Sequence, residues 1–195
     1  MNKDINQTQL VLDFHDDIKI EELLYLTNLK ELTLFNFKLD NYVLSIISKL
    51  NLIKLVFVNC EIEDLSLITN LNLIDLQIIN CKFDDFEYIN DFKSLECLTL
   101  QRFDFVDLSL LPIIKKLKKL DLYFSNIGNK EEIISAQNLE ELRIDRTNFD
   151  DLSLITNLNL KRLIIGRKQI KNIDLLDKKI DIVDEMNQRI VDYGE

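Results

Sequence analysis

The sequence offers few residues whose chemistry could support catalysis. His15 is the only histidine, and it is followed directly by Asp16 and Asp17, an order that superficially resembles a general base beside an acid that orients it. No nucleophile pattern stands near it, and the chain has no glycine-rich phosphate loop. Paired acids such as Asp150 and Asp151 are better explained as helix caps than as catalytic dyads. We therefore expect His15 to be a solvent-facing turn residue and the chain not to be an enzyme.

Cysteine is the other residue type that could carry chemistry. Cys60 and Cys81 are 21 residues apart and fall at the same position of two adjacent sequence repeats. Their α-carbons would then be about 4.8 Å apart, one strand spacing, which a disulfide can bridge. We favour buried free thiols, as expected in a reducing compartment. No Cys-x-x-Cys pair or Cys and His set indicates a metal site, and no motif requires a cofactor.

A repeat supplies the elements that would position these residues. The ten residues DLSLITNLNL stand at 64–73 and recur letter for letter at 151–160, 87 positions later, which is four steps of about 22. Each copy leads into an LxxLxL pattern, whose alternation predicts a short strand with one buried face. The first leucines of seven such patterns follow one another at intervals of 21 to 23 residues: Leu29, Leu52, Leu73, Leu95, Leu117, Leu139 and Leu160.

The return path after each strand has its own pattern. Ten positions after the first leucine stands an apolar residue that we expect to turn inward: Leu39, Ile62, Phe83, Phe105, Ile127, Phe149 and Ile170. In four repeats an Asp then precedes a short apolar pattern, and we interpret it as the cap of a helical turn: Asp64, Asp85, Asp107 and Asp151. Residues 41–49 and 130–137 lack this motif and are predicted to form true α-helical turns.

The repeats predict a single domain over residues 1–195. Residues 1–28 would form an N-terminal cap and degenerate repeat with a first strand at 9–14, and residues 29–176 the seven repeats. Residues 177–195 would form the C-terminal cap, with a last short strand at Ile180 and Ile182. With 3 Gly and 1 Pro, the sequence has few of the breakers that mark a linker between domains.

With its repeats in register, the chain resembles the leucine-rich repeat family, specifically the 22-residue class of bacterial internalins and SDS22-like phosphatase regulators. The segment LTNLKELTLFNFKL at residues 26–39 is similar to the internalin consensus. The resemblance implies an α/β fold, a right-handed leucine-rich repeat solenoid curved into a horseshoe or arc. It would have a parallel β-sheet on the concave side and short helices or 3-10 turns on the convex side.

One position departs from the family pattern. Eight residues after the first leucine the family places an inward Asn that bonds the backbone of neighbouring turns, whereas this chain has other residues there: Phe37, Cys60, Cys81, Phe103, Ser125, Thr147 and Lys168. Asn36, Asn59 and Asn80 sit one position earlier. We expect Cys, Ser and Thr to replace the Asn with a weaker hydrogen bond and the two Phe to pack instead.

The residues that alternate with the buried leucines would face a partner. An apolar patch is predicted near the N-terminal half, made of Phe35, Val56, Val58 and Ile79. A mixed aromatic and charged group follows on the same face, made of Arg102, Asp121, Tyr123, Phe124, Arg143, Asp145 and Arg146. Tyr and Arg often anchor protein interfaces, although β-propensity alone would also place Val, Ile, Tyr and Phe in strands. We interpret both groups as protein-binding.

The charge balance limits the kind of partner. With 34 acidic and 24 basic residues the net charge is −10, which argues against nucleic acid and is better suited to a basic protein, although acidity also serves solubility. The sequence shows no secretory signal and no run of about 18 apolar residues, so we expect a cytoplasmic monomer outside the membrane. The predicted role is a protein-binding inhibitor or regulator, such as a bacterial immunity protein that masks a toxin. The alternative is a surface or secreted internalin-like recognition domain cut from a longer protein.

Overall fold

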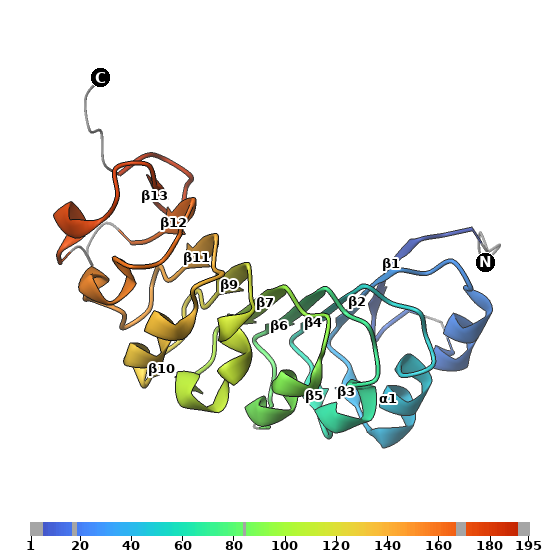
Figure 1. Cartoon of the computed structure of the whole chain (residues 1–195). Coiled ribbons are helices and arrows are strands. Elements are labelled where there is room, and N and C mark those ends of the chain that lie inside the picture. The colour runs from blue at the N-terminus through green and yellow to red at the C-terminus, as the bar shows by residue number, and fades with distance from the viewer. Residues whose placement is uncertain (1–5, 17–18, 84, 167–170, 191–195) are drawn as a thin grey trace. The chain divides into compact units, whose positions relative to one another are not determined.

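The computed structural model describes residues 6–16, 19–83, 85–166 and 171–190. Two compact units divide the chain, residues 1–95 as unit 1 and residues 96–195 as unit 2. In each unit short parallel strands lie on one side and helical turns on the other (Figure 1). Parts of the predicted features lie outside the described residues: residues 1–5, 17 and 18 of the N-terminal cap, Lys168, Ile170, and the end of the C-terminal cap from residue 191.

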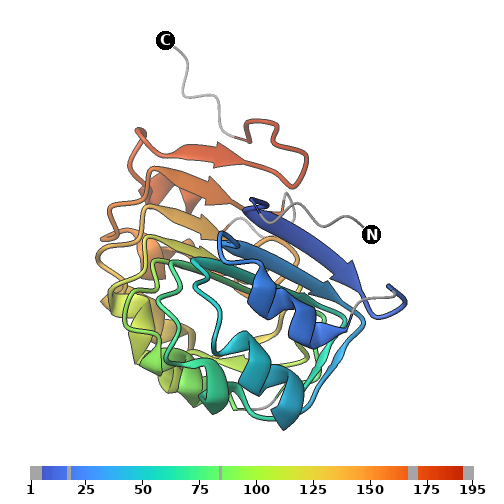
Figure 2. The same ribbon diagram turned by 90° about the vertical axis from the view of Figure 1, so that its right-hand side faces the viewer.

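Among the described residues of unit 1, four parallel strands follow one another in chain order. They are β1 (Gln9–Asp13), β2 (Glu31–Phe35), β4 (Lys54–Val58) and β6 (Asp75–Ile79). A separate two-stranded parallel sheet is formed by β3 (Lys38–Leu39), which follows β2, and β5 (Glu61–Ile62), which follows β4. The helical turns are η1 (Ile20–Tyr25), α1 (Asn41–Ile47), η2 (Leu65–Ile68) and η3 (Phe86–Asp91). Figure 2 shows these turns on one side of the strands of this unit.

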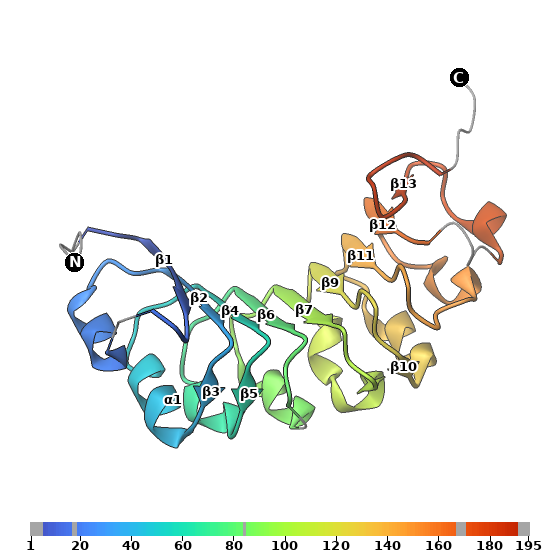
Figure 3. The same ribbon diagram turned by 180° about the vertical axis from the view of Figure 1, so that it is seen from behind.

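Unit 2 repeats the same plan, as Figure 3 shows from behind. Its strands are β7 (Cys97–Gln101), β9 (Lys119–Asp121), β11 (Glu141–Arg143), β12 (Arg162–Ile164) and β13 (Asp181–Val183), all parallel. The small pair is β8 (Val106–Asp107) with β10 (Ile127–Gly128). The part of unit 2 that the structure describes also has the 3-10 turns η4 (Leu108–Leu110), η5 (Pro112–Lys115), η6 (Lys130–Ser135), η7 (Leu152–Ile155) and η8 (Ile173–Leu175).

The strands are held in register by their leucines. Leu32 pairs with Leu55 and Leu55 with Leu76, and all three side chains are fully buried. The equivalent residues Leu98, Leu120 and Leu142 do the same in unit 2. Because a one-residue slip would turn each buried leucine to solvent, the LxxLxL pattern fixes the register as well as the strand. This confirms the strands that the repeat predicts, including β1 and β13 near the two ends.

Caps on the helical side follow the predicted motif in three of four repeats. Asp64, Asp107 and Asp151 each accept a hydrogen bond from the backbone N–H two residues later, at 3.0, 2.9 and 2.9 Å. Asp85 makes no such side-chain bond, so its predicted role as a cap is wrong.

The predicted α-helical turns are correct in one case and wrong in the other. The first, α1, is an α-helix whose Asp40 side chain accepts a hydrogen bond from the Val43 N–H at 2.9 Å. The second, η6, is a 3-10 turn that begins after Asn129, a residue with φ of 47°. Unlike Asp40 before α1, Asn129 makes no capping side-chain hydrogen bond, so the first N–H groups of η6 lack the bond that stabilises the start of an α-helix.

One predicted core position is wrong. Phe105 was expected to turn inward, but its side chain is 54% exposed, and the next residue, Val106, is fully buried instead. The Phe105 ring lies over Gly128, where an added Cβ would come within 2.4 Å of the ring. The inward turn is thus displaced by one residue, and the ring rests against a glycine surface.

Cys and Ser take the place of the missing inward Asn, as predicted. The Cys60 N–H donates to the Cys81 sulfur at 3.3 Å, and the Cys60 thiol donates to the Leu34 carbonyl at 3.4 Å. In unit 2 the Phe103 N–H donates to the Ser125 hydroxyl at 3.1 Å. Cys60 and Cys81 are buried free thiols. The contact between the thiols lowers the pKa of Cys60 and, together with burial, raises that of Cys81.

Candidate functional site

The side of each sheet that faces away from the helical turns is called here the strand face. In unit 1 Phe35 pairs with Val58, and Val58 with Ile79, so that these three residues stand directly opposite one another on adjacent strands. All three are half-buried, and we call them the apolar row. Val56 lies on the same face but is only 8% exposed, so it offers a partner little surface. The apolar row is the part of the predicted patch that solvent reaches.

Val11, which the sequence reasoning did not name, enlarges this surface. Val11 lies on β1 opposite Thr33 and is 63% exposed, and Phe14 follows that strand and is 60% exposed. The Phe14 N–H donates to the Phe35 carbonyl at 3.0 Å, and the Phe14 ring contacts that of Phe37, with centroids 5.9 Å apart. The alternation of residues 9–14 contained the signal for Val11, because Val11 stands between Leu10 and Leu12 and so points to the opposite face of the strand.

In unit 2 the strand face carries a polar network. The Arg143 Nε donates to the Asp145 Oδ1 at 2.6 Å, and its Nη1 lies 3.8 Å from the Asp121 Oδ2. Asp121 also accepts hydrogen bonds from the Gln101 amide at 2.8 Å and from the Tyr123 N–H at 3.0 Å. Asp145 is fully buried and Asp121 nearly so. These two predicted site residues therefore hold Arg143 and the chain at Tyr123 in place and offer little surface of their own.

Burial and charge act against each other in this network. Burial raises the pKa of the Asp121 carboxyl, although the Tyr123 N–H and the Arg143 charge oppose the shift. Burial lowers the pKa of Arg143, but its bond to Asp145 and the charge of Asp121 outweigh that effect, so its pKa is raised overall. Arg143 therefore remains a fixed cation on the strand face.

Aromatic rings and guanidinium groups alternate above this network. The guanidinium carbon of Arg143 lies 4.4 Å from the Tyr123 ring centroid and that of Arg146 lies 5.9 Å from it. The Tyr123 and Phe124 ring centroids are 6.0 Å apart, and the guanidinium carbon of Arg102 lies 5.8 Å from the Phe124 centroid. Phe124 is 52% exposed. The structure thus brings the predicted residues of unit 2 into one continuous surface.

Arg146 has a partner that the sequence did not indicate. Its Nε and Nη2 donate to the two carboxylate oxygens of Glu185 at 2.6 and 3.0 Å. This fork-shaped pairing raises the pKa of Arg146 and lowers that of Glu185. Glu185 lies in the turn after β13, where Asp184 accepts hydrogen bonds from the N–H groups of Met186 and Gln188 at 3.0 and 2.8 Å. No short-range pattern connects residues 39 positions apart, so sequence alone could not pair them.

One repeat position has the same unusual backbone in both units. Seven residues after the first leucine, φ is positive at Asn36, Asn59 and Asn80 in unit 1 and at Arg102, Phe124 and Arg146 in unit 2, with values of 51° to 64°. Asn tolerates this left-handed conformation, whereas Arg and Phe adopt it at a cost of about 1–2 kcal/mol. We call this the αL position. Unit 1 uses the residue that fits the backbone, and unit 2 uses large side chains that do not.

The three Asn side chains of unit 1 form a hydrogen-bonded row. The Asn80 amide donates to Asn59 at 2.7 Å, Asn59 to Asn36 at 3.4 Å, and Asn36 to the Asp13 carboxylate at 2.6 Å. The row is exposed and runs beside the apolar row, one residue further along each strand. An amide ladder therefore exists here, at the αL position and on the surface.

No protein-family model and no curated protein sequence matches the chain. Its structure is similar to that of an internalin from Listeria monocytogenes, with a TM-score of 0.66 and 24% identity, over 91% of this chain and 56% of that one. Internalin C2 from the same species gives a TM-score of 0.59 with 20% identity, over 84% of this chain and 71% of that one. A leucine-rich repeat protein from Leptospira interrogans gives a TM-score of 0.54 with 20% identity, over 82% of this chain and 45% of that one.

This chain has the internalin-like leucine-rich repeat fold. The predicted fold class, an α/β solenoid with a parallel strand layer opposite short helical turns, is therefore confirmed. The chain spans about half the length of the first and third of these proteins.

Outside the strand face, the described residues include the histidine and the cysteines considered for chemistry in this internalin-like chain. His15 is exposed in the turn after β1, as predicted. Among the described residues, no group of three or more His, Cys, Asp or Glu side chains could hold a metal ion. Across the same residues, no helix has the length and apolar character needed to cross a membrane.

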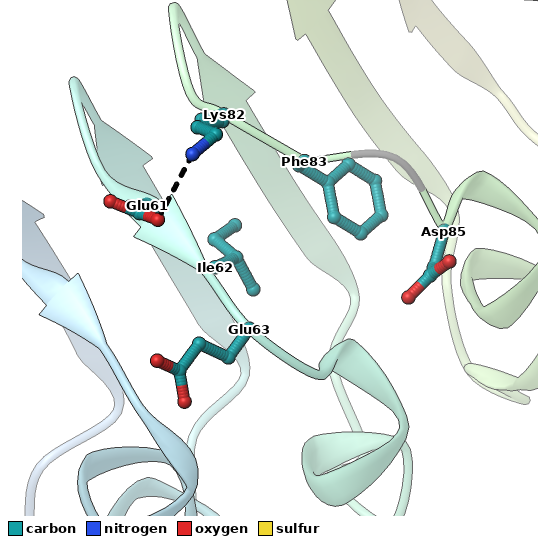
Figure 4. Close-up of a pocket in the computed structure, with 6 residues that line it drawn as sticks. All are labelled: Glu61, Ile62, Glu63, Lys82, Phe83 and Asp85. Carbon is teal, nitrogen blue, oxygen red and sulfur yellow. Dashed lines mark hydrogen bonds and ion pairs between the residues drawn. The ribbon is translucent and has the colours of Figure 1, made fainter.

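A pocket in unit 1 lies at the turns after β4 and β6. Its lining is formed by Glu61, Ile62, Glu63, Lys82, Phe83 and Asp85. Figure 4 shows Lys82 directed at Glu61, to which it donates a hydrogen bond at 3.2 Å, while Glu63 and Asp85 lie apart from them. The carboxylates do not converge on one point, so we assign this pocket no chemical role.

Proposed function

We propose that this chain is a non-enzymatic protein-binding module that acts through its strand face. We further propose that it is a cytoplasmic inhibitor or regulator, such as a bacterial immunity protein that masks a toxin. The observation that carries protein binding is the apolar row of Phe35, Val58 and Ile79, three half-exposed side chains in register on adjacent parallel strands.

Parallel sheets support the choice of this face. All-parallel sheets occur mostly in α/β proteins in which crossover helices cover both faces of the sheet. In unit 1 the helical turns cover one side of the strands (Figure 2), and the apolar row stands on the other. A protein partner on the strand face would remove these side chains from water, at about 25 cal/mol per Å² of apolar surface.

Charge supports a basic partner for unit 1. Residues 1–95 contain sixteen Asp and Glu against eight Lys and Arg, so this unit carries −8 of the total net charge of −10. A field of one sign attracts partners of the opposite sign and speeds their association. An inhibitor that must find its target quickly would gain from this arrangement.

Affinity capture with the intact chain tests protein binding. We expect one stoichiometric protein to be retained from a native lysate and identified by mass spectrometry. Val58→Asp places a charge in the apolar row and should weaken that capture at least about tenfold, because buried interface anchors dominate affinity. The matched control is Leu67→Asp, which introduces the same charge at an exposed leucine of η2 on the helical side. Equal capture by both variants would contradict binding through the strand face.

Co-expression tests the inhibitor role. The captured protein should be toxic when produced alone, and the wild-type chain, but not the Val58→Asp variant, should relieve the toxicity. Similarity to internalins favours one alternative, a surface or secreted recognition domain. In that case the retained protein would come from a foreign cell surface, and co-expression would protect against nothing.

A further inference from the structure

Arg102 and Arg146 stand at equivalent positions of their repeats, but only one of them is paired with a carboxylate. Both stand at the αL position of their repeats, with φ of 61° and 57°. Both project a guanidinium group toward an aromatic ring of the strand face, Arg102 toward Phe124 and Arg146 toward Tyr123. The repeat therefore presents the same cation twice, two repeats apart.

One of these two guanidinium groups pairs with a carboxylate of the same chain. Arg146 binds the Glu185 carboxylate through two hydrogen bonds at 2.6 and 3.0 Å. Arg102 is exposed and forms no side-chain hydrogen bond or ion pair with any residue that the structure describes; its guanidinium contacts the Phe124 ring. Glu185 thus shows which chemical group this position accepts, and Arg102 lacks that group.

Building on the protein-binding function proposed above, we infer that Arg102 is a binding site for an Asp or Glu carboxylate of the partner protein. Phe124 and Tyr123 supply the apolar flank on which a neighbouring side chain of the same partner segment packs. An Arg guanidinium forms two parallel bonds with a carboxylate, and a ring beside it shields those bonds from water. The occupant is an acidic segment of a protein that also carries an apolar side chain.

Backbone strain supports a binding role. Three of the six described αL positions carry Asn, which accepts the conformation readily, whereas Arg102 and Phe124 do not suit it. Large side chains held at a strained position are a recognised indication of function, because stability alone would favour Asn or Gly. Arg102 and Phe124 also contact each other, so both strained positions contribute to one surface.

The acidic segment contrasts with the basic surface expected opposite unit 1. Unit 2 is close to charge balance, with sixteen Lys and Arg against eighteen Asp and Glu, and its αL position carries two arginines. We therefore expect a partner that is basic where it meets the apolar row and acidic where it meets Arg102. A nucleic-acid strand would not combine these features.

A random 12-residue peptide library displayed on phage, selected on the immobilised full-length chain, tests this site. Peptides enriched on the wild-type chain and depleted on an Arg102→Asn variant should contain Asp or Glu beside an apolar residue. A synthetic copy of an enriched peptide should bind Arg102→Asn at least about tenfold more weakly, as expected for a lost charge-assisted pair. Replacing its acidic residue by Gln or Asn should cause a similar loss, and combining both changes should add little.

The Arg102→Asn substitution should not impair folding. Asn is the residue that three other repeats use at this position, so the variant should keep or gain thermal stability, by up to about 2–4 °C. Lys115→Asn is the control for loss of a positive charge, because Lys115 is exposed at the end of η5 on the helical side. It should leave peptide binding unchanged.

Three results would overturn the carboxylate site. Enriched peptides that bind the wild type and Arg102→Asn equally would overturn the carboxylate site but would not contradict protein binding through the strand face. A single-stranded 12-residue oligonucleotide that binds the wild type more tightly than any enriched peptide would replace the protein segment by nucleic acid. Failure to enrich any peptide on the wild-type chain would count against both the carboxylate site and the protein-binding function.

Discussion

Asp121 lies on the strand face of unit 2, yet its side chain is as inaccessible as many core residues. Sequence reasoning grouped it with Tyr123 and Arg143 because the alternation of the strand places all of them outside the leucine core. Accessibility, however, depends on the neighbours, and Asp121 is covered by Gln101 and Arg143, which bind it. Single-residue exposure on a face therefore could not be predicted from the repeat, whereas the face itself could.

The stability of an Asp121→Asn variant relative to the wild type should increase as pH rises. Burial raises the pKa of Asp121, so its contribution to stability is complete below the unfolded value of about 3.9 and is lost as pH rises through the raised pKa of the folded state. The amide does not ionise and avoids this loss. We expect the melting temperature of the variant, minus that of the wild type, to increase between about pH 4 and 7 in thermal denaturation.

The stability of a Glu185→Gln variant relative to the wild type should show the opposite pH dependence. Arg146 lowers the pKa of Glu185, so the stability that this pair contributes is present above about pH 4.3 and is lost as pH falls through the lowered pKa. The deficit of that variant should therefore shrink on acidification. A difference for Asp121→Asn that stays constant with pH would show that its carboxyl is not penalised by burial.

At the scale of the element, the capping Asp is the clearest test of what a motif can predict. The same pattern of Asp followed by an apolar residue stands at Asp85 and Asp107, but the Asp107 carboxylate accepts hydrogen bonds from the Ser109 N–H at 2.9 Å and from the Asn129 amide at 2.7 Å. Asp85 makes no capping bond. Asn129 comes from the next repeat, so only the fold could show that Asp107 also links two turns.

Asp107→Ala should therefore cost about 1 kcal/mol of unfolding free energy, within the range for a lost N-cap. Asp85→Ala is the matched substitution and should change that free energy by less than about 0.5 kcal/mol. Urea denaturation followed by circular dichroism measures both. Similar losses for the two variants would mean that charge near the turn matters and the hydrogen bonds do not.

At the scale of the whole chain, repetition made the architecture predictable. Seven LxxLxL patterns at one period each specify the same strand, so an error in one repeat, such as the inward turn assigned to Phe105, leaves the others correct. The surface does not repeat in this way. Whether the αL position carries Asn or Arg decides what the strand face can bind, and the sequence alone did not reveal the backbone conformation that makes the difference informative.

Repetition also predicts how stability is distributed along unit 1. Leu12, Leu34 and Phe57 form one buried row across β1, β2 and β4, in which Leu34 has a neighbour on each side. In the part of the chain that the structure describes, β1 pairs with β2 alone, so Leu12 has a neighbour on one side. Leu34→Ala should cost about 2–5 kcal/mol of unfolding free energy, the range for a buried leucine.

Leu12→Ala should cost distinctly less than Leu34→Ala, because the end of a stacked array relaxes more easily than its interior and its stability is a sum over neighbouring interfaces. Urea unfolding of the two variants measures the difference. Native-state hydrogen exchange should show the same order, with amides of β1 opening at lower free energy than those of β4. Equal costs and uniform exchange would instead mean that unit 1 unfolds as one cooperative core, with β1 as firmly held as the strands it stacks on.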